Sequence, residues 1–303
     1  MTISVTALED AVARPRSVAI GTFDGVHLGH REVIRGADTV LTFEPHPLQV
    51  IHPEAQPKLI MPFPIKRDAI ERTGVEELIV IGFDAAFSQV SAEDFCSRVL
   101  VETLGAKQVS VGENFRFGAR ARGTPEMLAA RTEFETRVVS LVDSDGETVT
   151  SSRIRALIAT GELSLAARLL GAPFMLEGQV VAGDRRGRTL GFPTANLIPN
   201  DALVIPGHGI YAAFANGMPA AVNVGVRPTF ETGRGLLVEA FLLDFDGDLY
   251  GKTLRIAFVA RLRGERRFAG ASELVEQMHR DVEEARKLCA SFSTPPDPTP
   301  GAV

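Results

Sequence analysis

Two histidines stand three residues apart in a glycine-rich stretch near the N-terminus. The stretch, residues 21–30, reads GTFDGVHLGH and follows the short apolar run 17–20. A glycine turn lets backbone amides approach a ligand closely, and a helix that opens near His27 offers N–H groups and its positive dipole end to phosphate oxygens. Three-residue spacing puts both rings on one helix face, where they can donate to the same triphosphate. The alternative is a strand-to-helix turn with two incidental histidines.

Three further segments could complete a nucleotide site. They are residues 43–47 (FEPHP), 111–118 (VGENFRFG) and 150–155 (TSSRIR). Asn114 can both donate and accept hydrogen bonds, and arginine forks suit phosphate oxygens. The alternatives place the two phenylalanines of 111–118 in the core and the two arginines of 150–155 on a solvated face. Together the segments describe a nucleotide site.

A second group of candidate residues lies beyond the middle of the chain. Residues 178–188 (GQVVAGDRRGR) form a glycine-spaced basic stretch, and residues 191–196 (GFPTAN) follow it. The first reads as a loop that cradles phosphate, and the second as a rigid turn presenting the hydroxyl of Thr194 and the amide of Asn196. Such oxygen ligands suit Mg²⁺, which usually shares substrate phosphates. A hairpin loop with solvated arginines is the alternative.

The elements that must position the first group alternate between strands and helices. Strands are expected at 17–20, 39–43, 78–81, 108–111 and 138–142, and a helix at 92–104 with Ser91 as its cap. Strands that alternate with helices predict a doubly wound parallel sheet with helices on both faces. In such sheets ligands bind beyond the carboxyl ends of the strands.

The pattern changes after residue 172. Strands are expected at 175–181, 210–215, 221–226, 236–243 and 254–259, followed by an amphipathic helix at 272–288. Strands at this spacing predict a small antiparallel barrel or sandwich. We therefore predict an N-terminal domain of residues 1–172, a second domain of residues 173–292 and a disordered tail of residues 293–303.

Composition sets the outer limits of these hypotheses. The chain has 303 residues, 45% of them hydrophobic and 23% charged, which fits a globular protein with a sizeable core. The net charge of −6 disfavours a general nucleic-acid or anionic-membrane binder, and two cysteines cannot build a disulfide framework. Without a leader-like segment or a long apolar run, we expect a cytoplasmic protein. A monomer or weak homo-oligomer acting on small molecules is the expected form.

The motifs together resemble the prokaryotic family of bifunctional riboflavin kinase/FMN adenylyltransferases, also called FAD synthetases. The resemblance spans residues 17–288. It covers the family patterns GxFDGxHxGH (21–30), TF(D/E)PHP (42–47), VGxxFxFG (111–118), SSTxxR (150–155), GFPTAN (191–196), VExxLLD (238–244) and LRxExKF (262–268). In 150–155 the hydroxyl types are exchanged, as TSS in place of SST. The resemblance implies a nucleotidyltransferase domain followed by a β-barrel kinase domain.

The resemblance also implies roles for individual residues. ATP for adenylyl transfer would be bound by Gly21, Phe23, Asp24, His27, His30, Asn114, Ser151, Ser152 and Arg155, with His27, His30 and Arg155 as the catalytic candidates. ATP for the kinase reaction would be bound by Gly183, Arg185, Gly187, Arg188, Thr194 and Asn196. Mg²⁺ would sit at Thr194 and Asn196, Glu239 would be the catalytic base, and the flavin would contact Glu239, Arg263 and Phe268. The implied small molecules are riboflavin, FMN and ATP.

One departure concerns the first crossover between strands. Only eight residues, 31–38, separate His30 from the second predicted strand, where the family has a distinctly longer helix. A parallel crossover needs a dozen or so residues, so the first helix should be short. This motivates an alternative in which the chain is a riboflavin kinase with a weak or inactive N-terminal domain. Two further alternatives are a flavin- or nucleotide-responsive regulator without turnover, and a nucleotidyltransferase acting on another phosphorylated small molecule.

Overall fold

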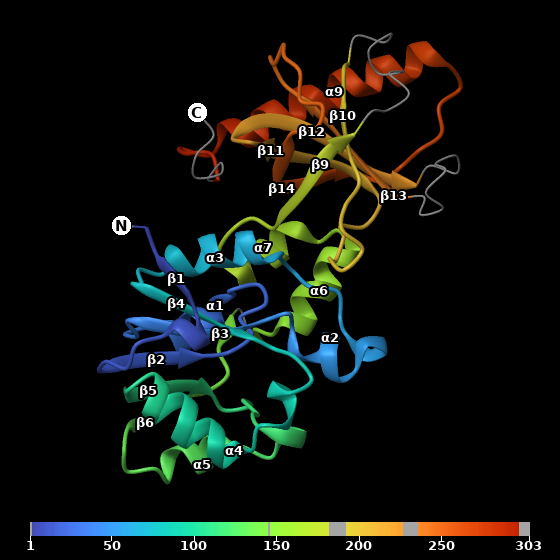
Figure 1. Ribbon diagram of the computed structural model, residues 1–303. Coiled ribbons are helices and arrows are strands. Elements are labelled where there is room, and N and C mark those ends of the chain that lie inside the picture. The colour runs from blue at the N-terminus through green and yellow to red at the C-terminus, as the bar shows by residue number, and fades with distance from the viewer. Residues whose placement is uncertain (1, 145, 182–191, 227–235, 297–303) are drawn as a thin grey trace. The chain divides into compact units, whose positions relative to one another are not determined.

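The computed structural model describes residues 2–144, 146–181, 192–226 and 236–296 (Figure 1). The chain divides into two compact units, one of residues 1–57 and 62–151 and one of residues 58–61 and 152–303. The predicted domain boundary at residue 172 stays a prediction, and the predicted disorder of the tail falls largely on residues 297–303, outside the described part.

A six-stranded parallel sheet forms the centre of the first unit. Its strands are β1 (Ser4–Ala7), β2 (Arg16–Ile20), β3 (Thr39–Glu44), β4 (Glu77–Gly82), β5 (Ala106–Gly112) and β6 (Glu135–Val139). They lie in the order β1-β4-β3-β2-β5-β6, so the chain builds outward from β2 in one direction through β3 and in the other through β5. This confirms the predicted doubly wound sheet. The edge strand β1 was not predicted.

Side-chain alternation along β5 shows how both faces of the sheet are covered. Val109 and Val111 point into a core shared with Phe95 of the helical segment that precedes β5. Ser110 points to the opposite face, where its hydroxyl donates to the carbonyl of Val33 (2.7 Å) in helix α1. Successive strand residues face opposite sides, so helices must lie on both.

Helix α1 (Leu28–Ile34) has seven residues, which confirms the predicted short first helix. The other helices of this unit are α2 (Pro47–Ile51), α3 (Phe63–Glu71), α4 (Ala92–Asp94) and α5 (Pro125–Ala129), with 3-10 turns η1 (Leu8–Asp10), η2 (Pro53–Ala55), η3 (Phe87–Gln89) and η5 (Ala119–Ala121). A small ribbon pairs β7 (Asp143–Ser144) with β8 (Glu147–Thr148).

Two sequence predictions in this unit need correction. The helix expected at 92–104 begins as predicted, with the Ser91 hydroxyl accepting from the amide of Asp94 (2.9 Å), but after one α turn it continues as the π-helix η4 (Phe95–Thr103). The strand expected at 138–142 runs instead from 135 to 139. Its ladder partner β5 ends at Gly112, opposite Val139, so pairing stops there.

The second unit contains a closed six-stranded antiparallel barrel. Its strands are β9 (Met175–Val181), β10 (Ala195–Leu197), β11 (Gly209–Ala215), β12 (Met218–Val226), β13 (Leu236–Leu242) and β14 (Thr253–Arg263), in the order β10-β13-β12-β11-β14-β9. Pairing of β10 with β9 closes the ring, which decides for a barrel over a sandwich. Tyr211, Phe258 and Phe174 pack together in its core, with ring centroids 5.5 and 5.9 Å apart.

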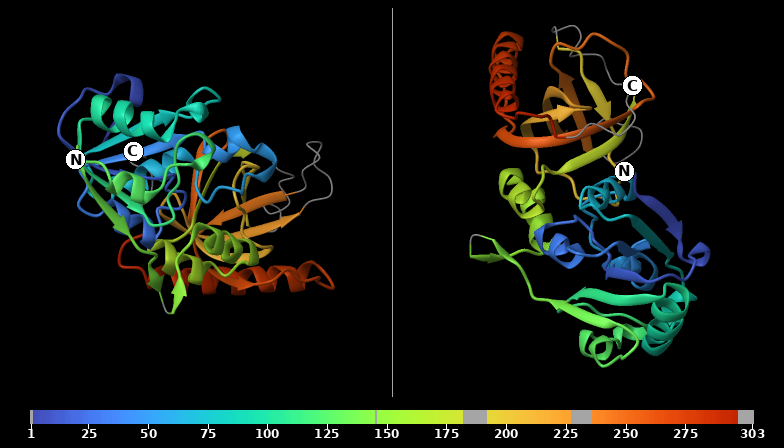
Figure 2. Two further views of the ribbon diagram at one scale, coloured as in Figure 1. Left: turned by 90° about the horizontal axis from the view of Figure 1, so that it is seen from below. Right: turned by 90° about the vertical axis from the view of Figure 1, so that its left-hand side faces the viewer.

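Helix α9 (Ala271–Ala290) lies along the outside of the barrel against β11, β12 and β14 (Figure 2). Near its end the Cys289 thiol donates to the carbonyl of Ala213 (3.3 Å). Helices α6 (Ser151–Thr160) and α7 (Leu163–Leu170) precede the barrel, and α7 packs on β14. None of the helices in the described ranges is long and apolar enough to cross a membrane.

Both cysteines are buried, and neither forms a disulfide. Cys96 lies inside η4 and is fully buried. Burial raises the pKa of its thiol to about 11, and burial also raises the pKa of Cys289. At neutral pH both thiols are therefore protonated and poorly reactive.

Candidate functional site

The loop between β2 and α1 holds its backbone in an unusual conformation. Phe23 and Val26 both lie in the left-handed region, with φ of 49° and 40°, and both side chains are buried. Left-handed backbone is costly for a β-branched residue and persists only where its surroundings enforce it, often at functional sites. Here the carbonyl of Val26 accepts a hydrogen bond from Nε of Arg31 (3.1 Å), and its amide donates to the carbonyl of Phe23 (3.1 Å).

The two histidines of the motif stack on one another. His27 is the N-cap of α1, and its Nδ1 accepts from the backbone amide of His30 (3.2 Å). The ring centroids are 3.6 Å apart, with 17° between the planes, and Phe23 meets His30 edge-on at 5.4 Å. Because Nδ1 of His27 accepts, the proton of its neutral ring sits on Nε2. The rings lie together as predicted, but the capping position of His27 brings this about, since it precedes the helix.

Within the first unit, one other predicted segment contacts this loop and a second leaves the sheet at the same edge. The hydroxyl of Ser151 donates to the carbonyl of the buried Asp24 (3.0 Å). β2 and β5 are parallel neighbours, so Gly21 and the turn after Gly112 leave the sheet at the same edge. Asn114 is exposed in that turn. We call residues 21–30, Asn114 and Ser151 the N-terminal site.

Of the remaining predictions for the N-terminal half, those for two polar residues stay untested and that for the two phenylalanines is decided. Ser152 and Arg155 lie in the first two turns of α6, which belongs to the second compact unit, so their roles stay predictions. Phe117 is a core residue and Phe115 packs against the same core, which confirms the core alternative for these aromatics. Their rings stack at 5.6 Å and form one end of a line of contacts. The line continues through Phe95, Phe87, Phe83 and Phe43.

Sequence reasoning missed a pocket beside that aromatic line. It has a volume of about 690 Å³ and lies where β3 and β4 end, with Glu44, Phe83 and Phe87 in its lining. Glu44 accepts from the ammonium group of the buried Lys66 (3.2 Å). The FEPHP motif pointed to Glu44, whereas Phe83 and Phe87 belong to no motif. We call this the aromatic pocket.

In the barrel, strand register aligns three polar side chains. Glu239 of β13 stands directly opposite Asn196 of β10 on one side and Asn223 of β12 on the other. Directly opposed residues in antiparallel strands share a face of the sheet. The amide of Asn223 donates to Oε2 of Glu239 (3.1 Å). Asn223 was not predicted, because nothing in its local sequence marks it.

The surroundings of Asn196 show whether these aligned side chains could bind a cation. Asn196 is 5% exposed, and its Oδ1 atom is buried with no hydrogen-bond donor among the described residues. A buried acceptor without a donor is costly and is normally satisfied by a ligand or water. Thr194, two residues away, supplies a hydroxyl. Oxygen donors of this kind fit Mg²⁺.

A cavity of about 630 Å³, the barrel pocket, brings together four of the five predicted kinase residues that lie in the described part of the chain. Thr194, Glu239, Arg263 and Phe268 all line it. Its other lining residues come from the GFPTAN motif, the strands, the residues after β14 and helix α9. They are Phe192, Ile210, Ala221, Asn223, Phe241, Glu265, Arg266, Arg267, Leu274, Met278, Asp281 and Val282. The predicted ATP contacts Gly183, Arg185, Gly187 and Arg188 lie outside the described residues.

Comparison with known proteins gives results for both halves of the chain. The FAD synthetase family matches residues 9–153, and the riboflavin kinase family matches residues 170–289. The bifunctional riboflavin kinase/FMN adenylyltransferase of Bacillus subtilis (strain 168) is 36% identical over 288 residues, covering 88% of this chain and 90% of its own length. The protein of that name from Escherichia coli (strain K12) is 36% identical over 289 residues, covering 89% and 92%.

A solved structure resembles nearly the whole chain. It is described as a macrolide-efflux protein from Streptococcus pneumoniae and is 30% identical in sequence. The match has a TM-score of 0.83 and covers 94% of this chain and 99% of the other.

Proposed function

The chain belongs to the family of bifunctional riboflavin kinase/FMN adenylyltransferases, and we propose that the barrel pocket and the N-terminal site carry its two reactions. The first reaction phosphorylates riboflavin with ATP to give FMN. The second adenylylates FMN with another ATP to give FAD and pyrophosphate. A kinase-only chain, a regulator without turnover and a transferase for another substrate are disfavoured, since both family halves are present.

The alignment of Glu239 with Asn196 and Asn223 carries the kinase assignment. In this reaction the 5′-hydroxyl oxygen of riboflavin attacks the γ-phosphorus of ATP, and ADP leaves. Glu239 accepts the hydroxyl proton, and the amide of Asn223 holds its carboxylate in one orientation. The aromatic and apolar lining of the barrel pocket suits the flat isoalloxazine ring.

Thr194 and Asn196 are the residues that would hold Mg²⁺, which supplies positive charge against the triphosphate. The buried Oδ1 atom of Asn196 supports this assignment. This atom belongs to the residue directly opposite Glu239 in the neighbouring strand. The basic stretch 183–188 is proposed to contact the phosphates of the same ATP.

Adenylyl transfer needs no protein nucleophile. A phosphate oxygen of FMN attacks the α-phosphorus of ATP, and the bond to the pyrophosphate oxygen breaks. The Nε2–H group of His27, the ring of His30 and the Asn114 amide are proposed to donate to phosphate oxygens as negative charge shifts to the leaving group. The roles of Ser152 and Arg155 stay predictions from the sequence motif. The aromatic pocket, at the same edge of the sheet, is proposed to take the flavin ring of FMN.

The remaining features of the proposal follow from the small-molecule chemistry. We propose that the protein acts in the cytoplasm, where ATP is available, as a monomer or weak homo-oligomer without nucleic-acid partners. The test of function is a time course with riboflavin, excess ATP and Mg²⁺, in which flavins are separated by chromatography. FMN should appear and then decline as FAD forms. FMN that accumulates without FAD, even when FMN is supplied, would contradict the assignment of the N-terminal site.

A further inference from the structure

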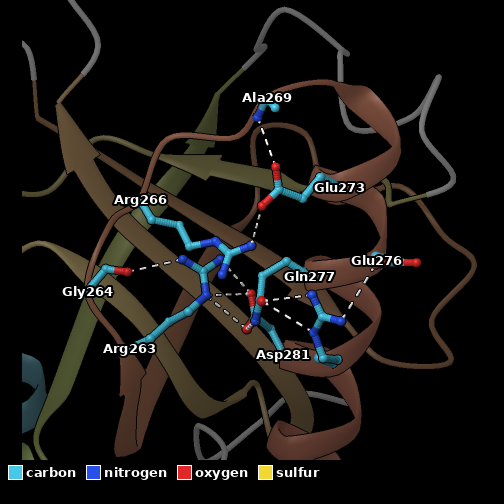
Figure 3. Close-up of polar contacts among 9 residues, drawn as sticks. Arg263, Gly264, Arg266, Ala269, Glu273, Glu276, Gln277 and Asp281 are labelled. Atoms are coloured by element: carbon cyan, nitrogen blue, oxygen red, sulfur yellow. Dashed lines mark hydrogen bonds and ion pairs between the residues drawn. The ribbon is translucent and has the colours of Figure 1, made fainter.

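One wall of the barrel pocket is built from two elements that are tied together by ion pairs. The first is the basic segment, residues 263–268, which begins at the last residue of β14, and the second is helix α9. Both contribute to the pocket lining. Figure 3 shows the side chains that join them. The catalytic candidates Thr194 and Glu239 come from other elements, near β10 and on β13.

The inner tie joins Arg263 to Asp281. Nε and one terminal nitrogen of Arg263 donate to the carboxylate of Asp281, the shorter contact being 2.6 Å, and the other terminal nitrogen donates to the carbonyl of Gly264 (3.0 Å). Gln277 donates to the same carboxylate (2.7 Å). Asp281 is 7% exposed, so this pair is largely shielded from water. A bidentate pair in this setting fixes the direction of the guanidinium.

The outer tie joins Arg266 to Glu273. One carboxylate oxygen of Glu273 accepts from Arg266 (2.8 Å), and the other accepts from the backbone amide of Ala269 (2.9 Å). Glu273 therefore binds the side chain of Arg266 within the basic segment and the backbone of the residue that directly follows the segment. Its carboxylate and that of Asp281 both lie on the side of α9 that faces the segment (Figure 3).

Phe268 contacts both of the arginines that form these ion pairs. The guanidinium carbons of Arg263 and Arg266 lie 5.7 and 4.6 Å from the centroid of its ring. Cations over an aromatic face are attracted to it, so two anchored guanidiniums restrict the ring. Phe268 itself lines the barrel pocket. The sequence assigned Arg263 to the flavin, whereas three of its nitrogens already bind protein oxygens.

We infer that Asp281 and Glu273 are positioning residues that set the affinity for riboflavin by holding the basic segment and Phe268 against the pocket. The inference rests on the proposed function, because it takes riboflavin as the occupant of the pocket. When the basic segment is no longer held in place, Phe268 packs less well on the flat ring system of riboflavin, and the affinity for riboflavin falls. It leaves Thr194 and Glu239 in place, so the phosphate chemistry persists.

The test is Asp281→Asn with separate measurement of KM for riboflavin and for ATP. Removing one charge of a shielded pair loosens the other partner, so KM for riboflavin should rise roughly tenfold or more. KM for ATP, kcat and adenylylation of added FMN should change less than about twofold, because their groups are untouched. Arg263→Gln should reproduce this result. If Asp281 acts through Arg263, the double variant should be no worse than either single one.

Two further variants separate positioning from general damage to the fold. Glu273→Gln, at a more exposed pair, should raise KM for riboflavin by a smaller factor of about threefold. Glu276→Gln is the matched control, since Glu276 pairs with Arg280 on the same helix at 3.7 Å with both side chains exposed. It should leave KM for riboflavin unchanged.

Several results would overturn the inference. They are an equal effect of Glu276→Gln, a parallel rise of both KM values in Asp281→Asn, an unchanged KM for riboflavin in Asp281→Asn, and additive effects in the double variant. Failure of the proposed function gives a different result, because the wild-type chain would then not phosphorylate riboflavin.

Discussion

The N-terminal site and the barrel pocket hold their functional groups in different ways. In the barrel, Asn196, Glu239 and Asn223 are neighbours because a hydrogen-bonded ladder puts them opposite one another. In the N-terminal site, His27 and His30 meet through a cap and a stacked ring pair, in a loop whose Val26 has left-handed backbone. A ladder fixes each residue through many bonds, whereas the loop depends on a few specific contacts. Single substitutions should therefore separate the two activities.

The largest effect is expected from Glu239→Gln. Glutamine keeps the size of the side chain and can still accept from Asn223, but it cannot take the hydroxyl proton. FMN formation should fall by about 10²- to 10⁴-fold, the usual contribution of a positioned base. FAD formation from added FMN should be retained, and chromatography of both products reports the two rates. Unchanged kinase activity would contradict the role of Glu239 and remove the basis of the comparison.

His30→Ala is the corresponding test of the N-terminal site. The change removes a proposed donor to the phosphates and the stacking partner of His27. FAD formation from FMN should fall by about ten- to a thousandfold, while FMN formation from riboflavin is spared. His52→Ala is a suitable control, because His52 is 62% exposed and pairs only loosely with Glu54 (3.5 Å). Equal loss of both activities in His30→Ala would argue for misfolding or a shared site.

Asn196→Ala tests whether the kinase reaction and FMN adenylylation have separate Mg²⁺ requirements. Loss of the Oδ1 ligand should raise the Mg²⁺ concentration needed for half-maximal kinase activity by about tenfold. The Mg²⁺ requirement of FMN adenylylation should stay the same, since Asn196 belongs to the barrel. The measurement is a Mg²⁺ titration of each reaction at saturating flavin. Equal shifts in both titrations would place the metal requirement elsewhere.

The smallest effect concerns acid stability of the parallel sheet. A hydrogen bond from Arg16 (2.8 Å), together with the charges of Arg16 and Arg14, holds the pKa of Glu77 below its ordinary value. The stabilisation is therefore complete above the unfolded-state pKa of about 4.5 and is lost as pH falls through the lower folded-state pKa. The protection of the β2 and β4 amides against exchange, relative to the intrinsic exchange rate at each pH, should fall in this acid range, and Glu77→Gln should weaken that dependence. The same pH dependence in the variant would contradict this account.

Much of the architecture could be predicted because apolar runs mark strands that are buried. Five strands of the parallel sheet, five strands of the barrel and the amphipathic helix α9 were found in this way. β1 was missed because two of its four residues are exposed and carry no apolar run. β10 was missed because two of its three residues, Ala195 and Asn196, lie inside the GFPTAN motif, which was interpreted for its chemistry and not as a strand. The π-helix η4 was missed because its apolar spacing reads as an ordinary α-helix.

The candidate sites could be predicted only where a motif marks the residue. Thr194, Glu239 and Phe268 were marked, and they share the barrel pocket. Asn223 and Asp281 were not, because one sits in a plain strand and the other is one of several acidic residues of a charged helix. Their importance comes from partners 16 and 18 residues away in sequence, Glu239 and Arg263. Such pairings exist only once strand register and helix packing are known.

The two buried cysteines make the protein a convenient starting point for site-specific labelling. A maleimide reacts with thiolate, and a solvent-exposed cysteine has a pKa of about 8.5. The pKa of about 11 at Cys96 leaves it more than a hundredfold less ionised near pH 7, and its side chain is fully covered. Cys289 is also covered and donates to Ala213. A cysteine introduced at an exposed position would therefore take up a fluorophore in preference to both native thiols.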